Sequence, residues 1–144
     1  MAITQDQQDA IVSRCSKIRD SLKDVQKEDA KARVHLGERY EAVLNRFIVP
    51  LNVRLVEKNL SNASLVENQN DFVEAKTMFA DDYIVYQREL EELVTLECKS
   101  NPSQFYEKLT KVRQKRKTME QDVMRLRSLI SQHVKLVKEL MEKM

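Results

Sequence analysis

Apolar residues recur through most of this chain at alternating steps of four and three, the spacing that places them in one stripe along an α-helix. The stripe is most regular in the last part of the sequence, where Asn101 and Pro102 have the residue types of a helix cap and first turn. Its members over 102–144 are Phe105, Leu109, Val112, Arg116, Met119, Val123, Leu126, Ile130, His133, Val137, Leu140 and Met144. A helix over this range would be roughly 63 Å long and would need packing partners along its whole length.

The first part of the chain repeats this pattern after Thr4 and Gln7, which have the spacing of a capping box. The stripe here consists of Ile11, Cys15, Ile18, Leu22, Val25, Asp29, Ala32 and Leu36. Beyond it the apolar face continues one residue out of step, which indicates a local stutter; its residues are Tyr40, Val43, Leu44 and Phe47. We predict a first helix over about 4–60 with a kink near Pro50, because proline removes a backbone donor.

The middle of the chain offers two places for the first reversal. Turn-forming residues from Ser61 to Ser64 favour a reversal there, with Asn62 or Ser64 capping the next helix, whereas Pro50 is the alternative. A second helix over about 64–99 has one apolar face, formed by Leu65, Phe72, Phe79, Tyr83, Tyr86, Leu90 and Leu93. The pattern therefore predicts an all-α fold, an elongated antiparallel three-helix bundle with coiled-coil-like packing that forms a single domain over 1–144.

Composition supports the helical class and excludes a membrane span. The 144 residues include one Gly and two Pro, and 33% are charged, so few tight turns and long surface-exposed helices are expected. The longest apolar stretch, 47–51, is far shorter than the roughly 18 residues that a spanning helix needs.

Two stripe positions carry charge instead of an apolar side chain. Antiparallel pairing places Arg116 beside Tyr83 or Tyr86 and near Asp29. We expect these four residues to form an internal polar layer that fixes register and contributes little net stability, in preference to a ligand site.

Cys15 and Cys98 are the only cysteines, and neither belongs to a C-x-x-C motif of a zinc ribbon or a redox enzyme. Two alternatives remain open at this point. The pair is either a disulfide between the first and second helices or two buried thiols, and a reversal between Pro50 and Ser61 would bring the two residues level.

The densest basic run, 111–117, is a candidate contact patch for phosphate through Lys111, Arg113, Lys115 and Lys117. No aromatic residue interleaves with it, and the net charge of the chain is only +2. The second helix offers counter-charges at Asp81, Asp82, Glu89, Glu91, Glu92 and Glu97. A solvated, paired helix face is therefore the favoured interpretation.

Catalytic and metal-binding patterns are not evident. A single Gly excludes glycine-rich phosphate loops, and His35 and His133 do not have the spacing of a helical metal pair. We therefore expect no enzyme activity, no catalytic residues, no cofactor and no metal.

Several segments resemble a group of uncharacterised exported bacterial helical-bundle proteins. The segments are Arg14-Cys15, Leu36-Gly37 to Tyr40, Phe47 with Pro50-Leu51, Val53-Arg54-Leu55-Val56 with Asn59-Leu60, Tyr83 with Tyr86, Cys98-Lys99, and Pro102 to Phe105-Tyr106 with Leu109 and Arg113. They cover most of the chain, and the two cysteine contexts and the Phe-x-x-Pro-Leu motif are the specific ones. The resemblance implies an exported protein whose signal is missing from this sequence and whose Cys15 and Cys98 are bridged, and it implies no activity.

We therefore expect a non-enzymatic helical bundle outside the bacterial cytoplasm, in the cell envelope or secreted. It would act as a structural module or as a protein-interaction module that binds a partner or a second copy of itself, with no small-molecule substrate. The alternative is a cytoplasmic adaptor or nucleic-acid-associated bundle that uses the 111–117 run, although nucleic acid is the less favoured partner.

Overall fold

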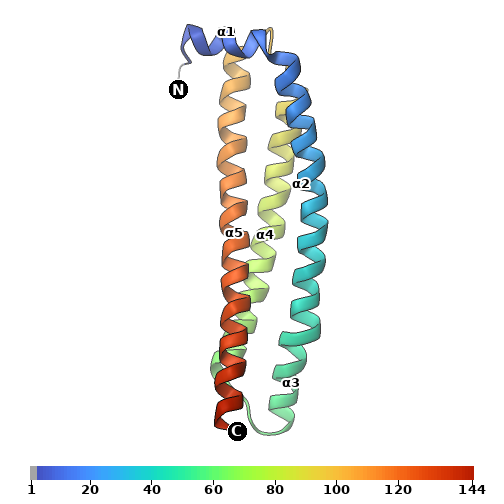
Figure 1. The fold of residues 1–144 in the computed structure, drawn as a ribbon, viewed down its shortest axis with the longest axis vertical. Coiled ribbons are helices and arrows are strands. Elements are labelled where there is room, and N and C mark those ends of the chain that lie inside the picture. The colour runs from blue at the N-terminus through green and yellow to red at the C-terminus, as the bar shows by residue number, and fades with distance from the viewer. Residues whose placement is uncertain (1–2) are drawn as a thin grey trace. The chain divides into compact units, whose positions relative to one another are not determined.

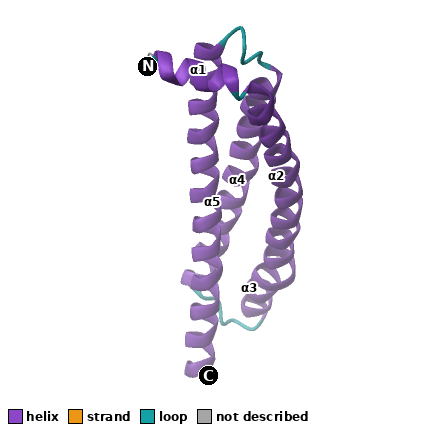
Figure 2. Cartoon of the chain, turned by 45° about the horizontal axis from the view of Figure 1, so that its top comes forward, coloured by secondary structure: helices purple, strands orange, loops and turns teal. Residues whose placement is uncertain are grey.

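The computed structural model describes residues 3–144, and every regular element in that range is helical. The elements are α1 (Gln5–Ser13), α2 (Cys15–Val43), a π-helical turn η1 (Leu44–Ile48), α3 (Val49–Glu57), α4 (Ala63–Thr95) and α5 (Pro102–Lys143) (Figure 1). Loops occupy only the short connections between helices (Figure 2). The predicted all-α class is confirmed.

The structure differs from the prediction of one first helix over 4–60 with a single kink. The Thr4 hydroxyl and the Gln7 side chain form the predicted capping box at the start of α1. That helix ends at Ser13, whose hydroxyl donates to the carbonyl of Ala10, and Arg14 leaves helical geometry. Side-chain bonds of this kind compete with the helical backbone. Figure 1 shows the result, with α1 turned across the end of α2.

Pro50 lies inside a helix and does not reverse the chain. The turn before it is widened, so that the Val49 amide donates to the carbonyl of Leu44, five residues back. Such a π turn inserts one extra residue into the helix. It lies directly before Pro50, which has no backbone N–H to donate to the preceding turn. The apolar pattern predicts its one-residue shift directly after Leu36, whereas α2 is regular there and the extra residue lies in η1. The apolar pattern predicts Phe47 on the apolar face, whereas the structure exposes Phe47 and buries Ile48.

The first reversal lies between Glu57 and Ala63. Asn59 adopts φ 56°, and the Leu60 amide donates to the carbonyl of Leu55, so the end of α3 has the geometry of a Schellman motif. Asn59 takes the left-handed position that glycine usually fills, which is how this glycine-poor chain turns. The Asn62 carboxamide then accepts from the Leu65 amide and caps α4, as one of the two predicted caps.

The described chain divides into two compact units. Unit 1 comprises Met1–Arg33 and Asp82–Met119, and unit 2 comprises Val34–Asp81 and Glu120–Met144. Each unit therefore contains part of the α2 region, part of α4 and part of α5. The single-domain interpretation of the chain stays a prediction.

Within unit 1, α4 runs antiparallel to both α2 and α5. Contacts between Arg19 and Glu97 and between Asp29 and Tyr86 fix the first pairing. In the second, α5 follows α4 after a short connection and runs back along it, with Lys108 in contact with Glu89 (Figure 1). The core of this unit consists of Ile11, Cys15, Tyr83, Tyr86, Leu90, Leu93, Cys98, Phe105 and Val112. Burial of these large apolar side chains is the main stabilising contribution.

Unit 2 has its own apolar core, made of Tyr40, Leu44, Ile48, Phe72, Ala75, Phe79, Leu126 and Leu129. The ring of Tyr40 meets those of Phe72 and Phe79 edge to face, with centroids 6.3 and 5.5 Å apart. Two buried asparagines accompany this core. The side-chain amide of Asn68 donates to the backbone carbonyl of Leu129, and the side-chain amide of Asn52 donates to the backbone carbonyl of Leu65.

No helix among residues 3–144 combines the length and the apolar character needed to cross a bilayer.

The second predicted helix, expected to reach about residue 99, ends at Thr95. The third begins at Pro102 as predicted, although the Asn101 side chain donates to the Ser100 hydroxyl.

Candidate functional site

A polar layer lies inside unit 1 where α2, α4 and α5 meet. The Tyr86 hydroxyl donates to Asp29 Oδ2, and Arg116 Nη2 lies 3.2 Å from Asp29 Oδ1. Three of the four residues expected in this layer are therefore in direct contact. Burial raises the pKa of Tyr86 above its ordinary value, and the hydrogen bond to Asp29 raises it further, so the phenol stays protonated and remains a donor.

Tyr83, the fourth expected member, has a different partner. The guanidinium of Arg33 lies 4.7 Å from the centroid of its ring, a cation–π distance. The rings of Tyr83 and Tyr86 are 6.1 Å apart, so the four expected residues and Arg33 form one contiguous set. The Tyr83 ring fills the layer, and Tyr83 and Tyr86 are both nearly fully buried. The arrangement is that of a packed polar layer within the unit 1 core.

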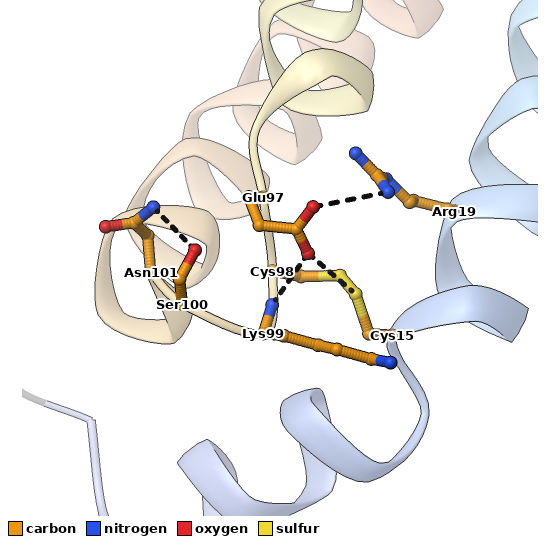
Figure 3. Close-up of polar contacts among 7 residues, drawn as sticks. All are labelled: Cys15, Arg19, Glu97, Cys98, Lys99, Ser100 and Asn101. Atoms are coloured by element: carbon orange, nitrogen blue, oxygen red, sulfur yellow. Dashed lines mark hydrogen bonds and ion pairs between the residues drawn. A yellow bond between two sulfur atoms is a disulfide. The ribbon is translucent and has the colours of Figure 1, made fainter.

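Cys15 and Cys98 lie at disulfide distance, with Cα atoms 5.7 Å apart (Figure 3). Cys15 is the first residue of α2, and Cys98 lies in the segment between α4 and α5. The two residues are level because α4 stops three residues before Cys98. Non-helical residues advance by about 3.3 Å each, compared with about 1.5 Å in a helix.

Glu97 organises the polar atoms around this cysteine pair. One carboxylate oxygen accepts from the Lys99 amide at 3.3 Å and lies 3.8 Å from the sulfur of Cys15, and the other lies 3.5 Å from Arg19 (Figure 3). Cys15, Glu97 and Cys98 are the one group among residues 3–144 with the proximity of a metal-ligand set. Paired cysteines have no thiolate to give to a metal, so we assign this group a structural role.

The basic run does not form one surface. Lys111 and Lys115 lie near Glu89 on α4, whose pKa is lowered by its hydrogen bond to Lys108 and further by these two cations. Arg113 instead lines a groove together with residues of α2. The cations of 111–117 are thus divided between two sides of α5, which argues against a continuous track for a phosphate backbone.

Lys108, which the sequence pattern did not single out, is the best-paired cation of unit 1. Its ammonium donates to Glu92 at 2.5 Å and to Glu89 at 2.9 Å. These two bonds raise its pKa above the ordinary value, with the bond to Glu92 making the larger contribution. The cluster joins α4 to α5 across their solvent-facing edge.

The most distinctive surface of unit 2 is an open apolar groove of about 480 Å³. Its lining consists of Val43, Phe47, Ile130, His133, Val134, Val137 and Lys138. The side chains of Phe47 and Val134 are 62% and 47% exposed, although both are large and apolar. Lys138 is the one charged residue in the lining. We refer to this surface as the unit 2 groove.

His133 forms part of the wall of the unit 2 groove. His133 is 7% exposed, and burial lowers the pKa of its imidazole below the ordinary value, so the side chain is neutral near pH 7. A neutral imidazole leaves the groove almost free of charge. The sequence pattern does not reveal the groove, because it predicts Phe47 on the apolar face of the helix. The one-residue shift in the apolar pattern after Leu36 indicates altered helical winding in this part of the chain, but it does not locate the π turn at Leu44–Ile48.

No protein-family model, curated protein or solved structure matches this chain.

Proposed function

We propose that this chain is a non-enzymatic helical module that acts outside the bacterial cytoplasm and binds a protein partner through the unit 2 groove. Within each unit, we propose, the three helical segments pack in the coiled-coil-like manner of a helix bundle. The observation that carries the functional proposal is the exposure of Phe47 beside an open apolar groove. Large aromatic side chains next to well-formed apolar pockets are typical energetic centres of protein interfaces.

The groove fits an amphipathic helix. Its walls come from the α2 and η1 segment on one side and from α5 on the other, and its apolar residues on α5 occupy one face at helical spacing. A helix laid into such a groove would contribute apolar side chains at every third or fourth position. Lys138 favours a partner with an acidic residue at the edge of its apolar face.

The cysteine pair supports a location outside the cytoplasm. Disulfides persist in oxidising compartments and are rare where thiols are kept reduced. Free thiols at Cys15 and Cys98, measured by alkylation of protein taken from its native compartment, would remove this part of the proposal. Protection of both cysteines until reductant is added is the expected result.

The interaction is tested by replacing Phe47 with Glu. Its side chain is largely exposed, so the variant should fold like the wild type and lose the affinity that burial of an aromatic ring supplies, about 1.5–3 kcal/mol. Val53→Glu is a matched control, because Val53 is also exposed and apolar but does not line the groove. Binding partners cross-linked to the wild type and to Val53→Glu should be absent from Phe47→Glu. Equal recovery with all three proteins would refute the assignment.

A further inference from the structure

Unit 1 has a second open groove, of about 540 Å³, between α2 and α5. Its lining consists of Arg14, Lys17, Ile18, Ser21, Leu22, Leu109 and Arg113. Ile18, Leu22 and Leu109 are partly buried and pack against the unit 1 core, so they form an apolar floor. Arg14 and Lys17 stand on one edge of this floor, and Arg113 stands on the other.

The three cations at the edges form no ion pair with any residue of the described range 3–144. Among residues 3–144, ion pairs occupy other basic residues of the same unit, including Arg19, Lys108 and Arg116. Neither Arg14, Lys17 nor Arg113 has an acidic partner in the described chain. The lining of this groove thus includes three cations and no acidic residue.

The backbone holds the cationic edges in place. Arg14 is the residue where α1 ends and α2 begins, and it is followed directly by Cys15 of the cysteine pair. Its position is therefore fixed at the corner between the two helices. Arg113 follows Leu109 by four residues, so the two lie one turn apart on the same face of α5. The groove thus presents charge along both sides of an apolar strip.

We propose that the unit 1 groove binds an acidic amphipathic helix of a partner protein. Such a helix has a central apolar stripe that would contact Ile18, Leu22 and Leu109. Acidic residues on its two flanks would pair with the three unpaired cations. The open form of the groove suits a helix, whereas small ligands are held in concave sites that bury most of their surface. This proposal does not depend on the unit 2 groove.

A model peptide of about 20 residues tests the proposal, since a helix of this length forms readily when bound. The peptide carries a leucine stripe flanked by glutamates, and a matched peptide carries lysines in place of the glutamates. Binding is followed by fluorescence anisotropy of a label on the peptide. The glutamate peptide should bind, with affinity that falls as salt is raised and the Debye length shortens from about 30 Å to about 8 Å. The lysine peptide should not bind.

Charge reversal in the groove provides the decisive comparison. The variant Arg14→Glu/Lys17→Glu/Arg113→Glu should bind the glutamate peptide at least about tenfold more weakly, because three pairings are lost. The same variant should gain affinity for the lysine peptide, which a misfolded protein would not do. Lys27→Glu is the control, because Lys27 is exposed on the opposite face of α2 and should leave binding unchanged.

Several results would overturn the proposal. These are equal binding of both peptides by the wild type, unchanged binding by the triple variant, or loss of binding in Lys27→Glu as well. Complete displacement of the peptide by anionic lipid vesicles or by single-stranded nucleic acid would point to those polyanions instead. Sedimentation of the isolated chain as an oligomer that the triple variant abolishes would assign the groove to a second copy.

Binding to the unit 2 groove is kept distinct by Phe47→Glu. That variant should bind the glutamate peptide as the wild type does, because Phe47 does not line the unit 1 groove. Loss of peptide binding in Phe47→Glu would place the peptide in the unit 2 groove and refute the assignment to unit 1.

Discussion

Reduction of the Cys15–Cys98 pair should strongly destabilise the protein. The two cysteines are 83 positions apart in the sequence, so a disulfide closes a long loop and restricts the unfolded chain. The chain-entropy relation for a loop of this length gives about 4.5 kcal/mol at 25 °C. This is a large fraction of the 5–15 kcal/mol that is typical of a folded domain. The unfolding midpoint in urea should therefore fall by about 2 M, for a denaturant slope of about 2 kcal/mol per molar.

The assay is equilibrium urea unfolding followed by far-UV circular dichroism, with and without dithiothreitol. A Cys15→Ala/Cys98→Ala variant separates the cross-link from packing, because both cysteines are almost fully buried in the unit 1 core. Its free energy of unfolding should lie within about 1 kcal/mol of that of the reduced wild type, since two small cavities are added. Dithiothreitol should have no effect on this variant.

The reasoning fails if the reduced and oxidised wild-type proteins differ by less than about 1 kcal/mol. Such a result would mean that the unfolded chain is already compact around these residues, or that the two sulfurs are not bonded. Mass spectrometry after alkylation, carried out without reductant, distinguishes these two explanations. A mass shift at both cysteines would show free thiols.

Four further substitutions test the internal polar groups. Tyr86→Phe should lower the free energy of unfolding, measured in urea titrations, by about 1–2 kcal/mol, because the buried Tyr86 hydroxyl donates to a carboxylate. Arg116→Met should lower it by less than about 1 kcal/mol, because the Arg116 side chain is 45% exposed. The reverse order of the two effects would contradict this account of the polar layer. Asn68→Ala should cost about 1–3 kcal/mol by the same measurement, since a buried amide that donates to two acceptors is lost, and a cost near zero would show that water replaces it. Burial lowers the folded-state pKa of His133 below its unfolded value, so the contribution of neutral His133 to stability is complete above about pH 6.5 and is lost as pH falls toward the folded pKa. The thermal unfolding midpoint of His133→Gln should therefore depend less on acid pH than that of the wild type. An unchanged pH dependence would argue against this role of His133.

The polar layer shows how much register can be read from a heptad pattern. Asp29 and Arg116 were identified because they interrupt otherwise apolar stripes, and antiparallel helices with short connections can meet in only a narrow range of registers. That constraint accounts for the contacts of Asp29 with Tyr86 and with Arg116. Arg33 over Tyr83 was not anticipated, because a cation–π contact leaves no periodic signature.

The basic residues of 111–117 show where a linear pattern is insufficient. Neighbours in sequence are separated by about 100° around a helix, so a dense run distributes its charges over several faces. Lys111 lies near Glu89, while Arg113 reaches the groove beside α2. Only the positions of the adjacent helices determine which of these cations is paired and which is left free.

The sequence alone determined the helical class, the long stripe of α5 and the four residues expected in the polar layer, and it narrowed the cap of α4 to Asn62 or Ser64. Each of these depends on periodicity or on local backbone chemistry, which act over a few residues and leave a direct trace in the order of amino acids. The π turn before Pro50 and the exposure of Phe47 were decided by tertiary structure. A one-residue change in helical winding costs little locally, so its position is selected by packing against distant segments, and that packing determines which apolar side chains are left to form a groove.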